Sequence, residues 1–386
     1  MRFFHLSDLH IGKLLNSYNL KDMQIDVLDK TIELIKEYRP DAIIIAGDVY
    51  DKSVPSAEAY EIFDDYLTKL SKIEPSIPVL IIAGNHDNAQ RLAYAKSFFK
   101  MHNIHVSVMP PQTKEEHLEK ITLHDEYGAV NFYLLPFTKP SYVRNLVDCN
   151  EPLTYNQAVE YLIKRENIDY SERNVLIAHQ FFIAGDSSPE KCDSELAYIS
   201  VGGVDSVDTK CVENFDYVAL GHIHGPQKIG KDYIRYSGTL LKYSVSEERH
   251  NKSITMVTLN EKENGASYEL IPVKSFRDVR SVKGTIDEVI KMANEDNRDD
   301  YVSITLTDEH LFRPKDILDE YYNNILEVRV DNQRTRKKLE DVEISDTSLT
   351  PYEAFTEFYQ EMNGQPMSEE EEKVFNEILL KIQEEV

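Results

Sequence analysis

Residues 79–87 read Val-Leu-Ile-Ile-Ala-Gly-Asn-His-Asp, a short apolar run that ends in a glycine and three polar side chains. The run is short and largely aliphatic, which is typical of a strand buried on both faces. Amphipathic stretches at residues 22–38 and 57–70 have the spacing of helices. Because strand-like runs alternate with these helices, the sequence predicts an α/β fold built around a sheet. Comparable runs lie at residues 3–6, 42–46, 175–178 and 217–220.

Each of these five runs is followed directly by side chains that can bind a metal ion. The carboxyl ends of strands hold the ligands in open α/β sheets, so we expect these side chains to converge at one edge of the sheet. Any one of the motifs alone has an ordinary explanation as a turn or a polar surface. Five of them, each after a strand, favour a shared metal site. The residues are Asp8, His10, Asp48, Asp51, Asn85, His86, His179, His222 and His224.

The chemistry of these side chains indicates the kind of metal. Carboxylate and amide oxygens with imidazole nitrogens, and no thiolate, suit Mn²⁺, Fe²⁺ or Zn²⁺ better than Ca²⁺. The set is too large for one ion with open positions, but it fits two ions about 3.5–4 Å apart that share a carboxylate. Such a pair generates hydroxide from water and holds a phosphate for in-line attack. The sequence therefore predicts a two-metal phosphoesterase.

Composition narrows the class of protein. The chain has 386 residues, of which 41% are hydrophobic, so two or three domains with a sizeable core are expected. Lys and Arg number 43 against 68 Asp and Glu, a net charge of −25. This argues against binding of nucleic acid by overall positive charge, but not against a nuclease whose metal ions and partner supply a positive field. Three cysteines without CxxC spacing, no long apolar run and no export signal predict a cytoplasmic protein without a membrane segment.

The five motifs follow one another in the order Asp-x-His, Gly-Asp-x-x-Asp, Gly-Asn-His-Asp, His and Gly-His-x-His. This order resembles the pattern of the calcineurin-like metallophosphoesterases. Residues 1–12, 91–92, 236–238 and 355–359 further resemble the SbcD family, bacterial nuclease subunits related to the double-strand-break-repair nucleases. This resemblance covers the whole chain. It implies a metallophosphoesterase β-sandwich flanked by helices at residues 1–275, a small α+β capping domain at 276–340, and a linker with a C-terminal helical hairpin at 341–386.

The same resemblance implies roles for the motif residues. One metal ion would be held by Asp8, His10 and His224, the second by Asn85, His179 and His222, and Asp48 would bridge them, with Mn²⁺ as the expected ion. His86 would face the scissile phosphate as a catalytic group. Asp51 is interpreted as a partner that orients His86, with a helix-capping role as the alternative.

The implied activity is that of a DNA nuclease subunit, a 3′-to-5′ exonuclease and endonuclease for DNA ends and hairpins. It would act near the nucleoid, as a homodimer within a heterotetramer with an SbcC-like coiled-coil ATPase. Residues 346–386 are expected to bind that ATPase, because residues 339–386 carry 14 acidic and 2 basic residues, a net −12, beside two apolar helical stripes. The basic run at residues 334–338 is either a solvated linker or a phosphate contact. A stand-alone phosphatase or phosphodiesterase and a non-catalytic scaffold are the alternatives.

Overall fold

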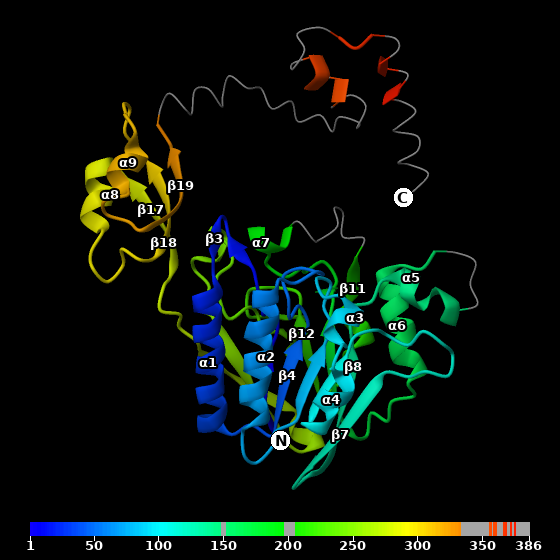
Figure 1. Ribbon diagram of the computed structural model, residues 1–386. Coiled ribbons are helices and arrows are strands. Elements are labelled where there is room, and N and C mark those ends of the chain that lie inside the picture. Colours follow the sequence, from blue (N-terminus) through cyan, green and yellow to red (C-terminus); the bar gives the residue numbers. More distant parts are fainter. Residues whose placement is uncertain are drawn as a thin grey trace. The chain divides into compact units, whose positions relative to one another are not determined.

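The computed structural model describes residues 1–147, 152–196 and 205–332, and some of the residues between 355 and 375. The chain divides into two compact units, Met1–Val330 and Asp331–Val386. Figure 1 shows the first unit as strands flanked by helices, with a smaller module of its own sheet at residues 279–330.

A mixed six-stranded sheet in the order β16-β15-β1-β4-β5-β6 forms one layer of the first unit. Strands β1, β4, β5 and β6 are parallel, and β15 and β16 extend the sheet, with β15 antiparallel to β1 and β16 antiparallel to β15. Two long helices, α1 and α2, cover its outer face with their apolar stripes. The bounds are β1 Arg2–Leu6, β4 Ala42–Ala46, β5 Val79–Ile82, β6 Ile104–Ser107, β15 Ser253–Leu259, β16 Ala266–Pro272, α1 Lys21–Tyr38 and α2 Ala57–Ser71.

A second six-stranded sheet, in the order β13-β14-β12-β9-β8-β7, lies against the first. Its central strands β14, β12, β9 and β8 are parallel to one another. Helix α6 packs on its outer face. The bounds are β7 Glu119–Asp125, β8 Gly128–Leu135, β9 Arg173–His179, β12 Tyr217–Gly221, β13 Gln227–Ile229, β14 Lys231–Tyr236 and α6 Tyr155–Arg165.

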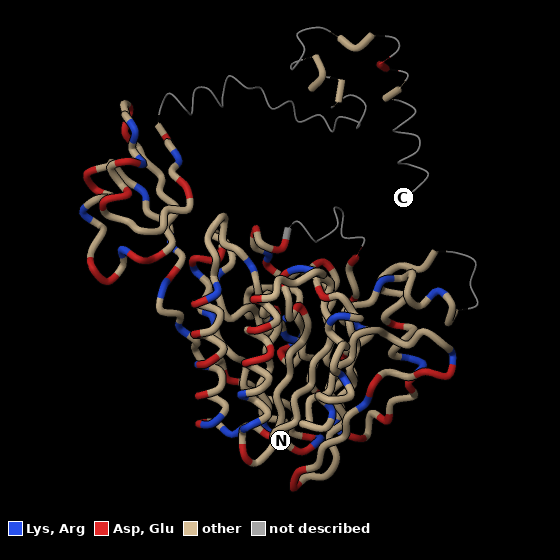
Figure 2. The backbone as a smooth tube through the Cα atoms, viewed as in Figure 1, with Lys and Arg blue, Asp and Glu red and all other residues tan. Residues whose placement is uncertain are grey.

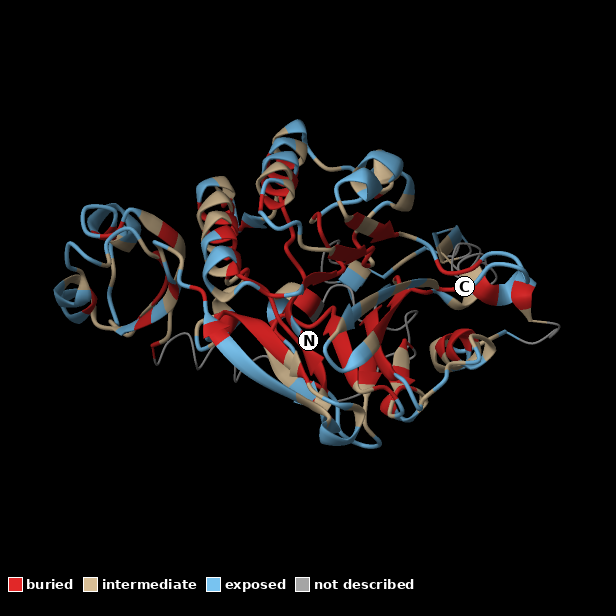
Figure 3. Ribbon diagram, turned by 90° about the horizontal axis from the view of Figure 1, so that it is seen from below, coloured by how far each residue is buried: buried red, intermediate tan, exposed pale blue. Residues whose placement is uncertain are grey.

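The space between the two sheets is an apolar core. The Phe3 ring from the first sheet makes edge contacts with Phe132 and Tyr217 of the second at centroid distances of 5.5 and 5.6 Å. Figure 3 shows buried residues along the strands and on the inward faces of the helices. The predicted β-sandwich flanked by helices is therefore confirmed, but the expectation of a single sheet is wrong. Strands buried on both faces look alike whether a helix or another sheet covers them, so periodicity could not show this.

The small module is built of alternating strands and helices. Its three strands form a parallel sheet in the order β17-β18-β19, around a separate apolar core. It touches the larger part where Tyr18 Oη donates to Ile325 O at 3.1 Å. The bounds are β17 Val279–Gly284, α8 Ile286–Met292, β18 Tyr301–Leu306, α9 Pro314–Leu318 and β19 Asn324–Val330.

Shorter elements fill the connections of the first unit. They are β2 Leu14–Leu15, β3 Tyr18–Asn19, α3 Ala89–Leu92, α4 Lys96–Met101, α5 Pro140–Val143, η1 Arg144–Leu146, β10 Phe181–Ile183, α7 Asp193–Leu196, β11 Ser206–Asp208, η2 Thr209–Cys211, η3 Val245–Glu247 and η4 Lys262–Asn264.

In the second unit, two tail segments contact each other. The Phe355 ring stacks on Phe375 at 4.1 Å, and Tyr359 Oη donates to Glu371 Oε1 at 2.7 Å. These contacts agree with a helical hairpin, although much of the predicted hairpin and the basic run at residues 334–338 lie outside the described residues. Across the described ranges, none of the helices combines the length and apolar character that crossing a bilayer requires.

Candidate metal centre

The two sheets meet at the carboxyl ends of β1, β4, β5, β9 and β12. Backbone hydrogen bonds fix the first two loops to each other, from Asp8 N to Gly47 O at 2.9 Å and from His10 N to Asp48 O at 3.0 Å. The predicted ligands thus gather in one place, but from two sheets. Their possible metal-binding atoms, carboxylate oxygens and imidazole nitrogens, form three groups in which all of these atoms lie within 4.8 Å of one another. The groups are Asp8–His10–His224, Asp8–Asp48–His179 and His10–Asp48–His86.

The first group has a histidine pair whose nitrogens face each other. His10 Nε2 lies 3.1 Å from His224 Nε2, and both side chains are buried. Ser194 Oγ donates to Glu247 at 2.7 Å, so it accepts from His224 Nδ1 at 2.8 Å. This hydrogen bond leaves a lone pair on His224 Nε2, directed toward the group. A neutral imidazole with its second nitrogen held in this way is a suitable metal ligand.

The second group brings several oxygen acceptors close to the Nε2 atom of His179. His179 Nδ1 donates to Ala46 O at 2.8 Å, so its Nε2 faces Asn85 Oδ1 at 3.0 Å and Asp48 Oδ2 at 3.3 Å. His222 Nδ1 also lies 2.9 Å from Asn85 Oδ1. Without an ion, burial lowers the pKa of His179, but the Asp48 carboxylate outweighs it and the pKa rises to about 9. A divalent cation would take the place of that proton, so these residues fit a metal.

Several of these residues hold an unusual backbone conformation. Asp8, His10, Asp48 and His222 have φ angles of 53°, 43°, 51° and 102°. Positive φ costs a non-glycine residue roughly 1–3 kcal/mol, and it concentrates at functional sites. The backbone strain therefore coincides with the predicted ligands, which the sequence could not indicate.

The glycines before the motif residues make room for the ligands. A Cβ on Gly84 would lie 2.1 Å from Asp48 Oδ1, and a Cβ on Gly47 would lie 2.2 Å from His179 Nδ1. Gly47 also has a φ of +91°. The ligands pack directly on the glycine backbone. A larger residue in place of the glycine of the Gly-Asp or Gly-Asn motif would therefore collide with a ligand.

His86 is held by the backbone of Asp51. The His86 Nδ1–H donates to Asp51 O at 2.6 Å, and His86 Nε2 lies 3.9 Å from Asp48 Oδ2. The Asp51 carboxylate instead accepts from Lys13 Nζ at 2.9 Å. The Asp51 carbonyl oxygen thus contributes to the orientation of His86, and the predicted role of the Asp51 side chain stays a prediction. The capping alternative fails, since α2 begins after Ser56, whose side chain accepts from Ala59 N.

Sequence reasoning assigned no role to Asp87, which joins two of the loops. Its carboxylate accepts from the N–H groups of Val49, Tyr50 and Gly84 at 3.1, 3.0 and 2.9 Å. Burial raises the pKa of Asp87 to about 6. The residue ties the loop of Asp48 to the loop of Asn85, and its place inside the Gly-Asn-His-Asp motif was the available signal.

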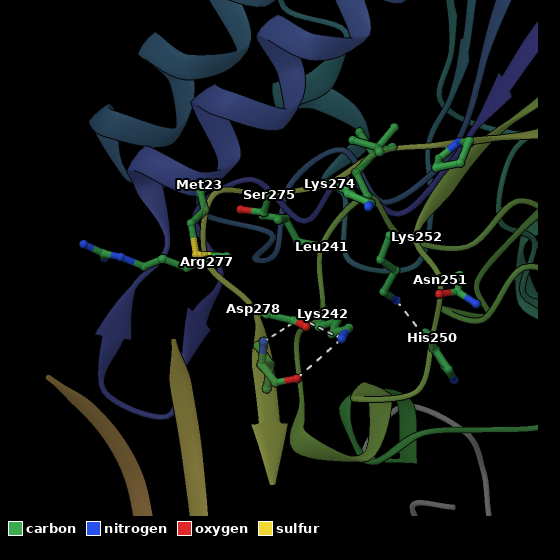
Figure 4. Close-up of a pocket in the computed structure, with 14 residues that line it drawn as sticks. Met23, Leu241, Lys242, His250, Asn251, Lys252, Lys274, Ser275, Arg277 and Asp278 are labelled. Carbon is green, nitrogen blue, oxygen red and sulfur yellow. Dashed lines mark hydrogen bonds and ion pairs between the residues drawn. The ribbon is translucent and has the colours of Figure 1, made fainter. Parts of the chain in front are cut away.

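A buried ion pair supports His224 from behind, and this too was missed. Lys252 Nζ donates to Glu247 Oε2 at 2.5 Å, to Thr239 Oγ1 at 2.6 Å and to His224 O at 3.1 Å. Burial would raise the pKa of Glu247, but Lys252 and His224 hold it well below its usual range. Figure 4 shows Lys252 beside His250 at a cavity of about 330 Å³ that Lys242 and Lys274 also line.

Comparison with known proteins agrees with this geometry. Residues 1–226 match the calcineurin-like phosphoesterase family, and residues 275–363 match a family described as the type 5 capsule protein repressor C-terminal domain, SbcD_C. The SbcD component of the nuclease SbcCD from Staphylococcus epidermidis is 33% identical over 330 residues, which is 84% of each chain. The chain belongs to the SbcD family. It is an SbcD-type nuclease homologue with a metallophosphoesterase fold.

Two solved structures are also similar to this SbcD-family chain. TT1561 of Thermus thermophilus is 13% identical with a TM-score of 0.40, and the match covers 71% of this chain and 99% of that one. GAP50, the anchor in the inner membrane complex of Plasmodium, is 16% identical with a TM-score of 0.39, and the match covers 71% of this chain and 85% of that one.

The charge pattern of this SbcD-family chain is mixed. Figure 2 shows acidic and basic positions interspersed along the larger part of the first unit, and the sequence as a whole has a net charge of −25. Metal ions would therefore be a main local source of positive charge for a phosphate substrate.

Proposed function

We propose that this SbcD-family chain is a DNA nuclease subunit that uses two divalent ions, with Mn²⁺ as the expected metal. It would hydrolyse phosphodiester bonds at DNA ends and hairpins, as a 3′-to-5′ exonuclease and an endonuclease. The supporting observation is that the buried carboxylate of Asp48 lies between the two candidate ligand sets, with its Oδ2 3.8 Å from His10 Nε2 and 3.3 Å from His179 Nε2. Asp8, His10 and His224 would hold one ion, and Asn85, His179 and His222 the other.

The bound ions would supply a hydroxide nucleophile and would neutralise the phosphate. The chain itself orients the groups around them. His86 is fixed through Nδ1 to a carbonyl oxygen, so Nε2 is the nitrogen placed to exchange a proton with the leaving oxygen. Asp87 keeps the loops of Asp48 and Asn85 at a fixed separation.

The principal alternative is a stand-alone phosphatase or phosphodiesterase with the same fold. The test is Mn²⁺-dependent cleavage of linear double-stranded DNA, compared with p-nitrophenyl phosphate. We expect cleavage of DNA to dominate. Efficient hydrolysis of the monoester together with no cleavage of DNA would favour the alternative, and activity on neither would favour a scaffold.

We further propose that residues 346–386 dock on an SbcC-like coiled-coil ATPase. The relative from Staphylococcus epidermidis is a subunit of an SbcCD nuclease. The tail also exposes apolar rings, and Phe358 is 57% accessible. Deletion of residues 346–386 should abolish co-purification with the ATPase while the remaining chain keeps its Mn²⁺-dependent nuclease activity. Full-affinity binding by the truncated chain would contradict this docking site.

The proposed assembly contains two copies of the chain, acting on nucleoid DNA in the cytoplasm. The segment that follows α3 and includes α4 exposes apolar side chains, Tyr94 at 92%, Phe98 at 60% and Met101 at 81%. An isologous contact between two copies would bury this patch from both sides. Phe98→Asp combined with Met101→Asp should convert a dimer to a monomer in light scattering, and an unchanged dimer would assign the contact elsewhere.

A further inference from the structure

A cavity of about 360 Å³ lies directly beside the second ligand group. Its size falls within the roughly 300–1,000 Å³ of small-ligand pockets. Asn85, a predicted metal ligand, forms part of its wall. The rest of the wall comes from the loop around Asn85, from Ser53, and from the segments that follow β6 and β8, including Met109, Phe137 and Tyr142. The cavity therefore lies next to the position that a phosphate held at the metal centre would occupy.

Phe137 reaches this position because β8 runs beside β9. Leu135, the last residue of β8, pairs with Ala178, which precedes His179. The Phe137 ring meets the His179 ring edge-on at 6.3 Å, and its N–H donates to Ala83 O at 2.9 Å. The end of β8 thus joins the same cluster of strand ends, but it contributes an aromatic ring instead of a metal ligand.

The loop that carries Phe137 is firmly held. Gln180 Nε2 donates to Thr138 O at 2.9 Å, and Thr138 Oγ1 donates to Pro136 O at 2.9 Å. Both Thr138 and Gln180 are 0% exposed. Lys139 follows at the rim as an exposed residue, immediately before Pro140 begins α5. The loop backbone therefore holds the Phe137 ring beside the cavity before a ligand binds, and the exposed Lys139 extends from the same loop.

We propose that this cavity is a nucleotide subsite, which takes the base of the nucleotide next to the cleaved phosphodiester. The base would leave its neighbours and stack against Phe137 and Tyr142, while Lys139 would contact the adjoining phosphate. Stacking on aromatic rings accepts any base, as a nuclease without sequence preference requires. Lys139 is the one lysine or arginine among the residues described as lining the cavity. This inference rests on the proposed nuclease activity and specifies how that site holds an unpaired nucleotide.

The test compares kcat/KM for a fluorescent oligonucleotide with kcat/KM for bis(p-nitrophenyl) phosphate, both with Mn²⁺. The small ester has no base, so it reports on the metal centre alone. Phe137→Leu should lower the ratio of DNA to ester cleavage by about 10- to 100-fold, the worth of one stacked base. Phe137→Tyr, which keeps the ring, should restore most of the ratio.

Two further measurements sharpen the test. An oligonucleotide without a base beside the cleaved bond should lose a similar factor with the unmodified chain, and Phe137→Leu should then add little, because both changes remove one interaction. Lys139→Gln should lower the slope of log(kcat/KM) against log salt by about one. The matched control is Tyr127→Leu, an exposed ring at the other end of β8, which should leave the ratio unchanged.

The outcomes separate the two proposals. An unmodified chain that cleaves the ester but no DNA would refute the nuclease function. Normal DNA cleavage with an unchanged ratio in Phe137→Leu, or with additive losses on the abasic substrate, would overturn the subsite.

Discussion

The imidazole of His86 is bound to the backbone of Asp51, with 2.6 Å between His86 Nδ1 and the carbonyl oxygen. The carboxylate of Asp51 is directed to Lys13. A backbone contact of this kind does not depend on which side chain residue 51 carries. The orientation of His86 should therefore survive substitution of Asp51.

His86→Ala should lower kcat by about two to four decades, the usual contribution of a general acid–base group. Asp51→Asn should lower kcat by less than a tenth of the factor expected for His86→Ala, because the contact between the Asp51 carbonyl oxygen and His86 Nδ1 remains. Both variants should bind two Mn²⁺ ions per chain in calorimetric titration. Loss of one ion in His86→Ala would show that His86 is a ligand instead.

Asp48→Ala should remove more metal than Asp8→Ala, because Asp48 Oδ2 lies near a predicted ligand of each ion, 3.8 Å from His10 Nε2 and 3.3 Å from His179 Nε2. We expect weak or absent Mn²⁺ binding in Asp48→Ala and retention of one site in Asp8→Ala. Two intact sites in Asp48→Ala would refute the bridging role.

Gly84→Ala should disrupt the metal centre without backbone strain at residue 84. The added Cβ would lie 2.1 Å from Asp48 Oδ1 and 2.4 Å from Asp48 N, so the carboxylate has to move. We expect Mn²⁺ affinity to fall by at least tenfold. Gly225→Ala is the control, since its closest contact, 3.2 Å to His250, lies outside the ligand groups. Equal affinities in both variants would argue against the steric role of Gly84.

Lys252→Met should lower the free energy of unfolding by about 3–5 kcal/mol, because it leaves the buried Glu247 carboxylate unpaired. Urea unfolding measures this cost. The double variant Lys252→Met with Glu247→Met should recover part of it, as the unpaired charge is then gone. A double variant less stable than the single variant would show that packing, not charge, dominates there.

Asp125→Asn tests the pH dependence of an ion pair outside the ligand groups. Its hydrogen bond to Arg173 holds the pKa of Asp125 below its ordinary value of 3.8. A depressed carboxyl pKa stabilises the fold above pH 4, and this contribution declines as the pH falls through and below 3.8. At pH 7 the variant should be about 1–3 kcal/mol less stable in urea, and the difference should shrink at pH 3. A difference that is constant with pH would exclude the ionised pair as its source.

The sequence predicted the strands, the two long helices and the cluster of ligands, because buried strands and Gly-Asp or Gly-Asn turns have local signatures. It placed Val175 and Val218 in the same sheet as Ile44, whereas they belong to a second sheet. Pairing between strands is a long-range property that a short apolar run does not encode. The positive φ of Asp8 could not be foreseen either, because residues other than glycine rarely adopt it.

The supporting residues were harder to find. Lys252 and Glu247 stand in no motif, and only their burial beside His224 shows their role. The carbonyl contact of Asp51 was also invisible, since a backbone atom leaves no trace in residue identity. A ligand can be read from its side chain, but the group that holds the ligand often cannot.

Each candidate ion draws on both sheets of the sandwich. Asp8 and His10 follow a strand of the first sheet and His224 follows one of the second, and the same division separates Asn85 from His179. A metal ion bound there would cross-link two sheets that are otherwise joined by apolar packing. Folding and metal uptake would then be linked equilibria, so a chelator would act on this domain as a mild denaturant, and no fragment with one sheet could keep either ion.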